Sequence, residues 1–192
     1  MRFLAAIGAL AIVAAIAAAV FFFGGFFNVA ASEPDLPPVA WALTQVRTAS
    51  IDRHAKDAPT VSLEDATVVQ AGAKAFAARG CANCHGAPGV TWAKFSEGLR
   101  PDPPDLKDVA GELEPRELFY VIKNGINMTG MPSFGAIEVG DPEIWQIVAF
   151  VKKLPTVSEA DYKSWTAAPP AEAPAAAPAP AAEPAPAAAE KK

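Results

Sequence analysis

The 192-residue sequence predicts an all-α fold, and three observations support this prediction. Three segments carry apolar residues at helical spacing, and no segment stands out as a strand with comparable clarity. The N-terminal stretch is apolar for long enough to form a membrane-spanning helix. The C-terminal stretch contains only small, polar and proline residues, so it cannot contribute to a core. We therefore expect a helical domain between a membrane helix and a disordered tail.

Composition divides the chain into four parts. They are a transmembrane signal anchor (1–31), a juxtamembrane connector (32–60), a globular domain (61–166) and a disordered Ala/Pro/Glu tail (167–192). The prolines of the tail forbid a continuous helix and favour polyproline character. The connector begins as proline-rich extended chain and contains one short helix, with Trp41, Leu43 and Val46 as its apolar positions.

The N-terminal segment is uncharged and apolar from Phe3 to Phe27. This is longer than the apolar region of a secretory signal, at roughly 7–15 residues, and long enough for a spanning helix, at about 20. Val29–Ala31 resembles a signal-peptidase site, so a cleaved signal is the alternative to an anchor. Arg2 favours a cytoplasmic N-terminus. We thus predict a single-pass protein of the bacterial cytoplasmic (inner) membrane with residues after 32 in the periplasm.

Helix signals place three helices in the globular part. The first helix begins at Ser62 or Asp65, with a capping box in "SLED", and ends at about Arg79, before Gly80. The second runs from Glu114–Pro115 to Gly125. The third runs from Asp141–Pro142 to Pro155. The stretch 86–113 is rich in Gly, Pro and Asp and is predicted to be loop. Three short helices and such a long loop make a thin core, so we expect an apolar group to complete it.

Charge excludes one class of partner. The net charge is −5 and the pI is near 5.1, which argues against a nucleic-acid partner because such a partner requires a basic face. A partner protein with a basic docking patch complements this charge better.

The sequence "CANCH" contains both cysteines of the chain and fits the C-x-x-C-H pattern of c-type haem attachment. Two thiols can add to the two vinyl groups on one edge of the porphyrin, and the next histidine is then placed under the iron. The predicted cofactor is one covalently bound haem c, held by Cys81 and Cys84 through thioethers and by His85 as proximal iron ligand.

Three alternatives use the same residues. A thioredoxin-like dithiol requires a βαβ context, whereas a helix precedes Gly80. A zinc site requires four ligands, and His54 is the one further strong candidate. A Cys81–Cys84 disulfide would leave His85 and the thin core unexplained.

An electron-transfer haem needs a sixth ligand. Apart from Met1, the methionines are Met128 and Met131, both in the glycine-punctuated segment "GINMTGMPSFG". Such a segment is a poor place for core filler, and Pro132 restricts the backbone after Met131. We predict Met131 as the sixth ligand, with Met128 as the alternative; His54 lies in a charged connector and is less suitable.

Over residues 62–155 the sequence resembles the class I c-type cytochromes, which are small all-α carriers with three to five short helices around one haem. The resemblance rests on "GAKAFAARGCANCHG", "PPDL", "TGMPSFG" and "EIWQIVAFVKKL". It implies that the first and last helices cross, with Gly72 and Phe76 meeting Ile147 and Phe150. It also implies that the carbonyl of Pro104 accepts the ring proton of His85, and that Leu106 packs on the porphyrin.

The resemblance further suggests which side chains surround the haem. Candidates for the haem edge are Trp92, Phe95, Tyr120 and Phe134, and candidates for its propionates are Tyr120 and Arg100.

These features predict an electron carrier rather than an enzyme. The chain would be a membrane-anchored periplasmic cytochrome c that passes one electron at a time between respiratory-chain components at the membrane surface. A fixed cytochrome subunit of a larger dehydrogenase or oxidase complex is the first alternative. A haem enzyme or gas sensor with an open iron site is the second.

Overall fold

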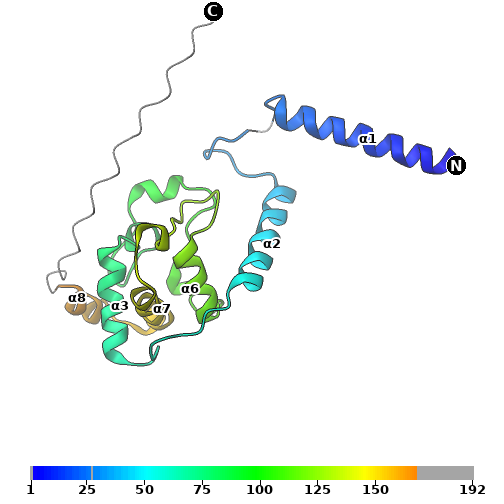
Figure 1. Ribbon diagram of the computed structural model, residues 1–192. Coiled ribbons are helices and arrows are strands. Elements are labelled where there is room, and N and C mark those ends of the chain that lie inside the picture. Colours follow the sequence, from blue (N-terminus) through cyan, green and yellow to red (C-terminus); the bar gives the residue numbers. More distant parts are fainter. Residues whose placement is uncertain (1, 27, 168–192) are drawn as a thin grey trace, which may run out of the picture.

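The computed structural model describes residues 2–26 and 28–167, and helices dominate this part of the chain (Figure 1). Ala87 and Val90 form an isolated β-bridge, and the described residues contain no strand. The predicted all-α fold is confirmed. The α-helices are α1 (Arg2–Phe23), α2 (Pro37–His54), α3 (Ala66–Ala78), α4 (Ala82–His85), α5 (Leu106–Val109), α6 (Pro115–Asn124), α7 (Asp141–Lys153) and α8 (Glu159–Thr166). The 3₁₀ helices are η1 (Lys94–Gly98), η2 (Gly135–Ile137) and η3 (Leu154–Thr156).

The first helix of the globular part, α3, begins at one of the two predicted positions. The N-cap is Asp65, whose carboxylate accepts a hydrogen bond from the backbone N–H of Thr67 at 2.7 Å. The capping box predicted in "SLED" is therefore wrong, because Ser62 lies before a turn that precedes the helix. The helix ends before Gly80, as the sequence predicts.

The core is built around the crossing of α3 and α7. A Cβ atom on Gly72 would lie 1.9 Å from the carbonyl oxygen of Gln146, so the two backbones approach as closely as a glycine allows. Phe76 and Phe150 pack beside this point with ring centroids 5.2 Å apart. The crossing expected from the resemblance is confirmed, with Gln146 as the closest neighbour of Gly72.

Two further helices cover this crossing. Phe119 of α6 stacks on Trp145 of α7 with ring centroids 4.2 Å apart. Tyr162 of α8 stacks on Phe150 at 5.6 Å, which places α8 against the opposite side of the α3–α7 pair. The sequence analysis did not identify α8 as a helix, although it included these residues in the domain.

The stretch 86–113, predicted to be loop, contains two short helices. The 3₁₀ helix η1 and the four-residue α5 interrupt an otherwise irregular path. The N-cap of α5 is Asp105, which accepts a hydrogen bond from the backbone N–H of Lys107 at 2.9 Å. These short elements give the loop a defined course between α4 and α6.

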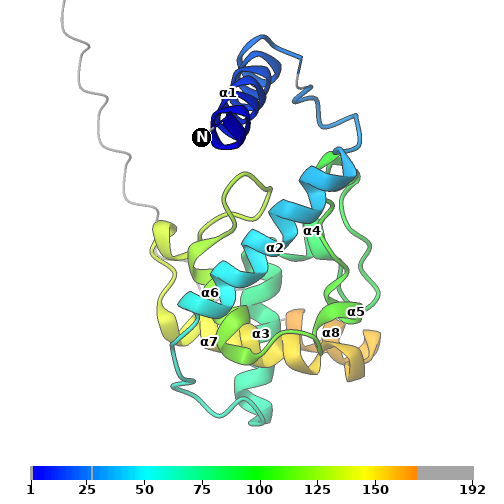
Figure 2. The same ribbon diagram turned by 90° about the vertical axis from the view of Figure 1, so that its right-hand side faces the viewer.

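The connector forms a longer helix than predicted. Helix α2 spans 18 residues and lies along the side of the domain that carries α6 (Figures 1 and 2). The predicted apolar positions of this helix, Trp41, Leu43 and Val46, lie in α2 with exposed side chains. Ile51, near the C-terminal end of α2, is buried because this end of the helix packs on α6.

Helix α1 is long and apolar enough to cross a membrane, and none of its residues is buried in the protein. A signal sequence near the N-terminus has the same properties. The predicted disordered tail lies outside the described residues from residue 168 onward.

Candidate functional site

Helix α4 follows almost directly after α3, with Cys81 as its N-cap and Cys84 within it. The backbone N–H of Cys81 donates to the carbonyl of Phe76 at 3.1 Å, and the N–H of His85 donates to the carbonyl of Cys81 at 3.0 Å. Both thiols are free and half-buried. Burial raises the pKa of Cys81 to about 12, so its side chain is a neutral thiol at physiological pH. The tight turn keeps both sulfurs and the imidazole on one short segment.

The imidazole of His85 is held by a single hydrogen bond. Its Nδ1–H donates to the carbonyl oxygen of Pro104 at 2.8 Å. The hydrogen bond expected from the resemblance is therefore present, and it leaves Nε2 with a lone pair for a metal. Burial lowers the pKa of His85, which favours the neutral, ligating form of the ring, although the bond to Pro104 opposes this shift.

The chain after Pro104 fixes that carbonyl in place. Asp105 caps α5, and Leu106 opens the helix with its side chain half-buried against the core. The role of Leu106 as a porphyrin contact stays a prediction.

A cavity of about 270 Å³ lies beside α4. Its lining includes Cys84, Trp92, Arg100 and Pro103. Trp92 packs close to Gly86, directly after the histidine, because a Cβ on Gly86 would lie 3.6 Å from its ring. The space next to the second cysteine is thus bounded by an aromatic ring and by the guanidinium of Arg100, which pairs with Asp102, and the carboxylates of Glu97 and Asp105 also line it.

The loop after α6 positions its two methionines very differently. Met131 is half-buried and packs against the core, whereas Met128 is 91% exposed. The backbone N–H of Met131 donates to Thr129 Oγ1 at 3.1 Å, and its carbonyl accepts from the N–H of Ile126 at 3.2 Å. These bonds fold the loop back on itself and direct the thioether of Met131, rather than that of Met128, into the domain.

Gly125 allows this fold-back. It has φ +68°, and a Cβ there would lie 2.7 Å from the carbonyl carbon of Pro132. Only glycine satisfies both conditions without displacing the segment that carries Met131.

The segment that carries the Pro104 carbonyl and the loop that carries Met131 contact each other at one end of the site. A Cβ on Gly130 would lie 2.7 Å from Leu99 Cδ1, so the chain between α4 and α5 contacts the methionine loop. His85 and Met131 are therefore contributed by segments that touch each other, and their arrangement is consistent with ligation of one iron by imidazole and thioether.

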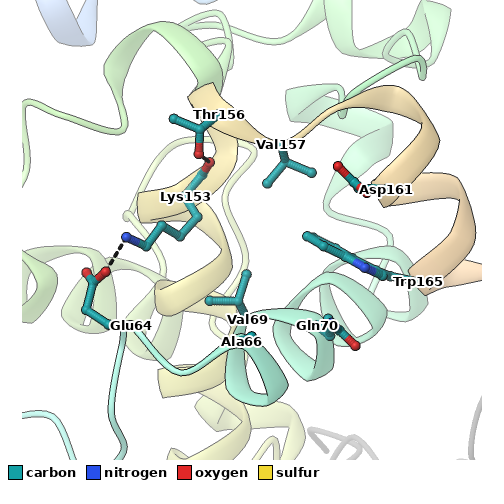
Figure 3. A pocket seen from close by; sticks show the side chains of 9 residues that line it. All are labelled: Glu64, Ala66, Val69, Gln70, Lys153, Thr156, Val157, Asp161 and Trp165. Atoms are coloured by element: carbon teal, nitrogen blue, oxygen red, sulfur yellow. Dashed lines mark hydrogen bonds and ion pairs between the residues drawn. The ribbon is translucent and has the colours of Figure 1, made fainter.

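A second cavity, of about 240 Å³, lies elsewhere, between the start of α3, the end of α7 and α8 (Figure 3). Val69, Val157 and Trp165 form its apolar walls, while Lys153 pairs with Glu64 at its rim (Figure 3). Its lining contains no cysteine, histidine or methionine, so it is separate from the predicted cofactor site.

The alternatives to haem find no support in this geometry. A helix precedes Cys81, so the βαβ context of a thioredoxin-like dithiol is missing from the described residues. The described residues contain no cluster of three or more His, Cys, Asp or Glu side chains suited to a metal ion such as zinc. The Nδ1–H of His54 donates locally to the Ser50 carbonyl oxygen at 2.8 Å, and the ring stacks on Tyr120.

The residues present fit a covalently attached haem. Cys81, Cys84 and His85 would hold such a group, and Met131 would supply a further ligand, inside an all-α fold closed by two crossing helices. This combination defines the class of the domain, which is a cytochrome c domain.

Residues 67–151 match the family model described as cytochrome C oxidase, cbb3-type, subunit III, and this part of the chain is a cytochrome c domain. The match covers somewhat less than half of the chain and excludes α1, α2 and α8. Neither the comparison with curated proteins nor that with solved structures gave a match. A cytochrome c domain that contains the C-x-x-C-H motif implies haem c as cofactor.

Sequence reasoning missed two contributors to the site. The contact of Leu99 with Gly130 has no signal in the sequence, because it joins two irregular segments. The stacking of His54 on Tyr120, at 6.1 Å, was missed because the connector was treated as separate from the domain.

Proposed function

We propose that this chain is a membrane-anchored periplasmic cytochrome c with a single haem, which carries one electron at a time between respiratory-chain components. The observation that supports the proposal is that His85, held by Pro104, and the half-buried Met131 lie on segments that contact each other. The haem supplies an iron that alternates between its ferrous and ferric states. Cys81, Cys84, His85 and Met131 are the residues that would bind it.

The protein groups around the site favour fast electron exchange because they change little with the charge of the iron. His85 is oriented by its bond to Pro104, so the imidazole cannot rotate between the two states. Met131 is held by backbone hydrogen bonds on both sides of its Cα. Imidazole and thioether ligation gives a higher potential than ligation by two imidazoles, which suits a carrier in an oxidising chain.

Partners would dock weakly at the surface near Cys84 and Trp92. Charges there are mixed and locally paired, as in the ion pairs Lys94–Glu97 and Arg100–Asp102. The net charge of −5 nevertheless favours a partner with a basic docking patch. Tethering through α1 would confine the domain to the membrane surface and raise its local concentration near membrane-bound partners.

The family match favours a second candidate, a fixed cytochrome subunit of a membrane oxidase. The family is described as subunit III of a cbb3-type oxidase, and the word subunit places its members in an oxidase complex. Purification from mild detergent distinguishes the two: a free carrier elutes alone, whereas a fixed subunit co-elutes with stoichiometric partner subunits.

Covalent haem attachment tests the core of the proposal. The full chain, expressed with a c-type maturation system, should retain haem after denaturation and give the pyridine haemochrome spectrum of two thioethers. The double variant Cys81→Ala/Cys84→Ala should lose the haem on denaturation. The proposal fails if the wild-type chain carries no haem, or if the double variant still holds it covalently.

A further inference from the structure

Helix α2 lies outside the segment that matches the family model, and it is in contact with the domain. Its C-terminal end docks on α6, where the ring of His54 stacks on Tyr120 with centroids 6.1 Å apart and Ile51 is buried. The next residue after the helix, Ala55, is fully buried. One face of α2 is therefore fixed toward the cytochrome domain.

The same face continues along the N-terminal half of the helix. At 100° per residue, Leu43 and Arg47 fall in line with Ser50 and His54, which lie at the docked end. Trp41 lies on the opposite side. Leu43 is nevertheless 58% exposed, and Arg47 makes no hydrogen bond or ion pair within the described residues. The domain-facing side of α2 thus presents a leucine and an unpaired cation that no described residue covers.

In the view of Figure 2, this uncovered half of α2 passes in front of the side of the domain that carries the candidate haem site. In Figure 2, α2 runs between the yellow-green loop that contains Met131, on one side, and the green segment after α4, on the other. These are the two segments that provide the sixth ligand and the Pro104 carbonyl. Figure 1 shows the same helix standing off the domain on the side of α6.

We propose that the N-terminal half of α2 covers the open side of the haem site, with Leu43 against the porphyrin edge and Arg47 facing the haem carboxylates. This inference rests on the proposed haem c function and adds residues outside the family segment to the cofactor site. The apolar side chain complements the porphyrin, and the guanidinium complements its two carboxylates. The contact of His54 with Tyr120 holds the C-terminal end of α2 on the domain. Because the helix is continuous, this contact also fixes the position of its N-terminal half.

The covering helix has a functional consequence. A redox partner would meet α2 beside the haem edge rather than a bare edge, and water would be excluded from that side of the porphyrin. Exclusion of water disfavours the additional positive charge of the ferric state.

The midpoint potential of the purified full chain tests this placement. Leu43→Glu puts a negative charge at the proposed haem edge, which should stabilise the ferric state and shift the potential downward. Trp41→Glu, on the opposite face of the same helix, is the matched control and should leave the potential unchanged. Arg47→Gln removes a positive charge near the haem and should also lower the potential.

The methyl groups of Leu43 give a second readout that requires no substitution in the measured protein. In the reduced, diamagnetic chain their NMR signals should be displaced from random-coil positions by the porphyrin ring current. Methyl signals at random-coil positions would overturn the proposal even if Leu43→Glu fails to fold.

Other results would also overturn it. An unchanged potential in Leu43→Glu, or an equal change in Trp41→Glu, would place α2 away from the haem. Loss of binding to phospholipid vesicles in Leu43→Glu but not in Trp41→Glu, with an unchanged potential in both, would assign this face of α2 to the membrane surface. Absence of covalent haem in the wild-type chain would instead refute the proposed function itself, so the two failures are distinguishable.

Discussion

Single backbone positions determine how the candidate ligands are presented. The Pro104 carbonyl orients the ring of His85, and the loop that carries Met131 depends on the conformation of Gly125. In both cases the residue that matters most contributes no side-chain chemistry. The positions of the ligands are therefore set by neighbours whose role is geometric.

Substitution of Gly125 tests this role directly. We expect Gly125→Ala to destabilise the protein by about 1–3 kcal/mol, because the residue has φ +68° and the new Cβ would meet the backbone of Pro132. Urea unfolding of the holoprotein measures the cost. Gly111→Ala is the matched control, because no atom lies within 4 Å of its added Cβ. Equal stability of the two variants would contradict the account.

At the scale of elements, the crossing of α3 and α7 holds the domain together. It joins the two ends of the segment that contains every predicted ligand. A bidentate ion pair from Arg79 to Glu143, with N–O distances of 2.7 and 3.0 Å, adds a contact between the end of α3 and the start of α7. Because both side chains are about one-third exposed, we assign most of the stability to the apolar contacts of the crossing.

The close approach at Gly72 makes this crossing sensitive to one methyl group. We expect Gly72→Ala to cost at least about 3 kcal/mol, since its Cβ would lie 1.9 Å from the Gln146 carbonyl oxygen and backbone atoms must move. Thermal unfolding followed by far-UV circular dichroism measures the change. An unaltered Tm would show that the helices do not cross at this point.

The helices of the domain were predictable from the sequence because each combines an apolar face with clear end signals. Pro115 and Gly125 bound α6, and Pro142 opens α7. The N-cap of α3 was less certain, because Ser62 and Asp65 are both good caps and the choice depends on the turn between them. Helix α8 was missed because its short, polar sequence contributes mainly Tyr162 to the core.

The candidate ligands were predictable for a different reason. The spacing of "CANCH" is dictated by haem chemistry, and the choice between Met128 and Met131 followed from the proline after Met131. The structure adds a physical basis for that choice, namely the burial of Met131 and the exposure of Met128. The position of α2 could not be predicted, because its exposed residues Trp41 and Val46 resemble an ordinary apolar face.

At the scale of the whole molecule, the chain combines a helix suited to a membrane, a helical connector and a cytochrome c domain. The family match covers the last of these alone. The connector nevertheless packs on the domain through Ile51 and His54, so α2 is part of the folded unit.

Membrane attachment through α1 is a prediction at this scale. An uncleaved anchor should keep the full-length chain in the membrane fraction after an alkaline carbonate wash, because its apolar span matches the bilayer core. A chain that begins at residue 32 behind a cleavable signal sequence is the control and should be released as a soluble, haem-containing protein. Release of the full-length chain by carbonate would indicate a cleaved signal and contradict the anchor.

The most direct test of the central claim is the near-infrared absorption of the ferric protein, which contains a weak band when methionine sulfur binds the iron. The account predicts that the wild-type chain and Met128→Ala show this band and that Met131→Ala lacks it. A band that persists in Met131→Ala and disappears in Met128→Ala would contradict the ligand assignment. A wild-type protein without the band, which binds carbon monoxide readily when reduced, would contradict the electron-carrier function and indicate an open iron site.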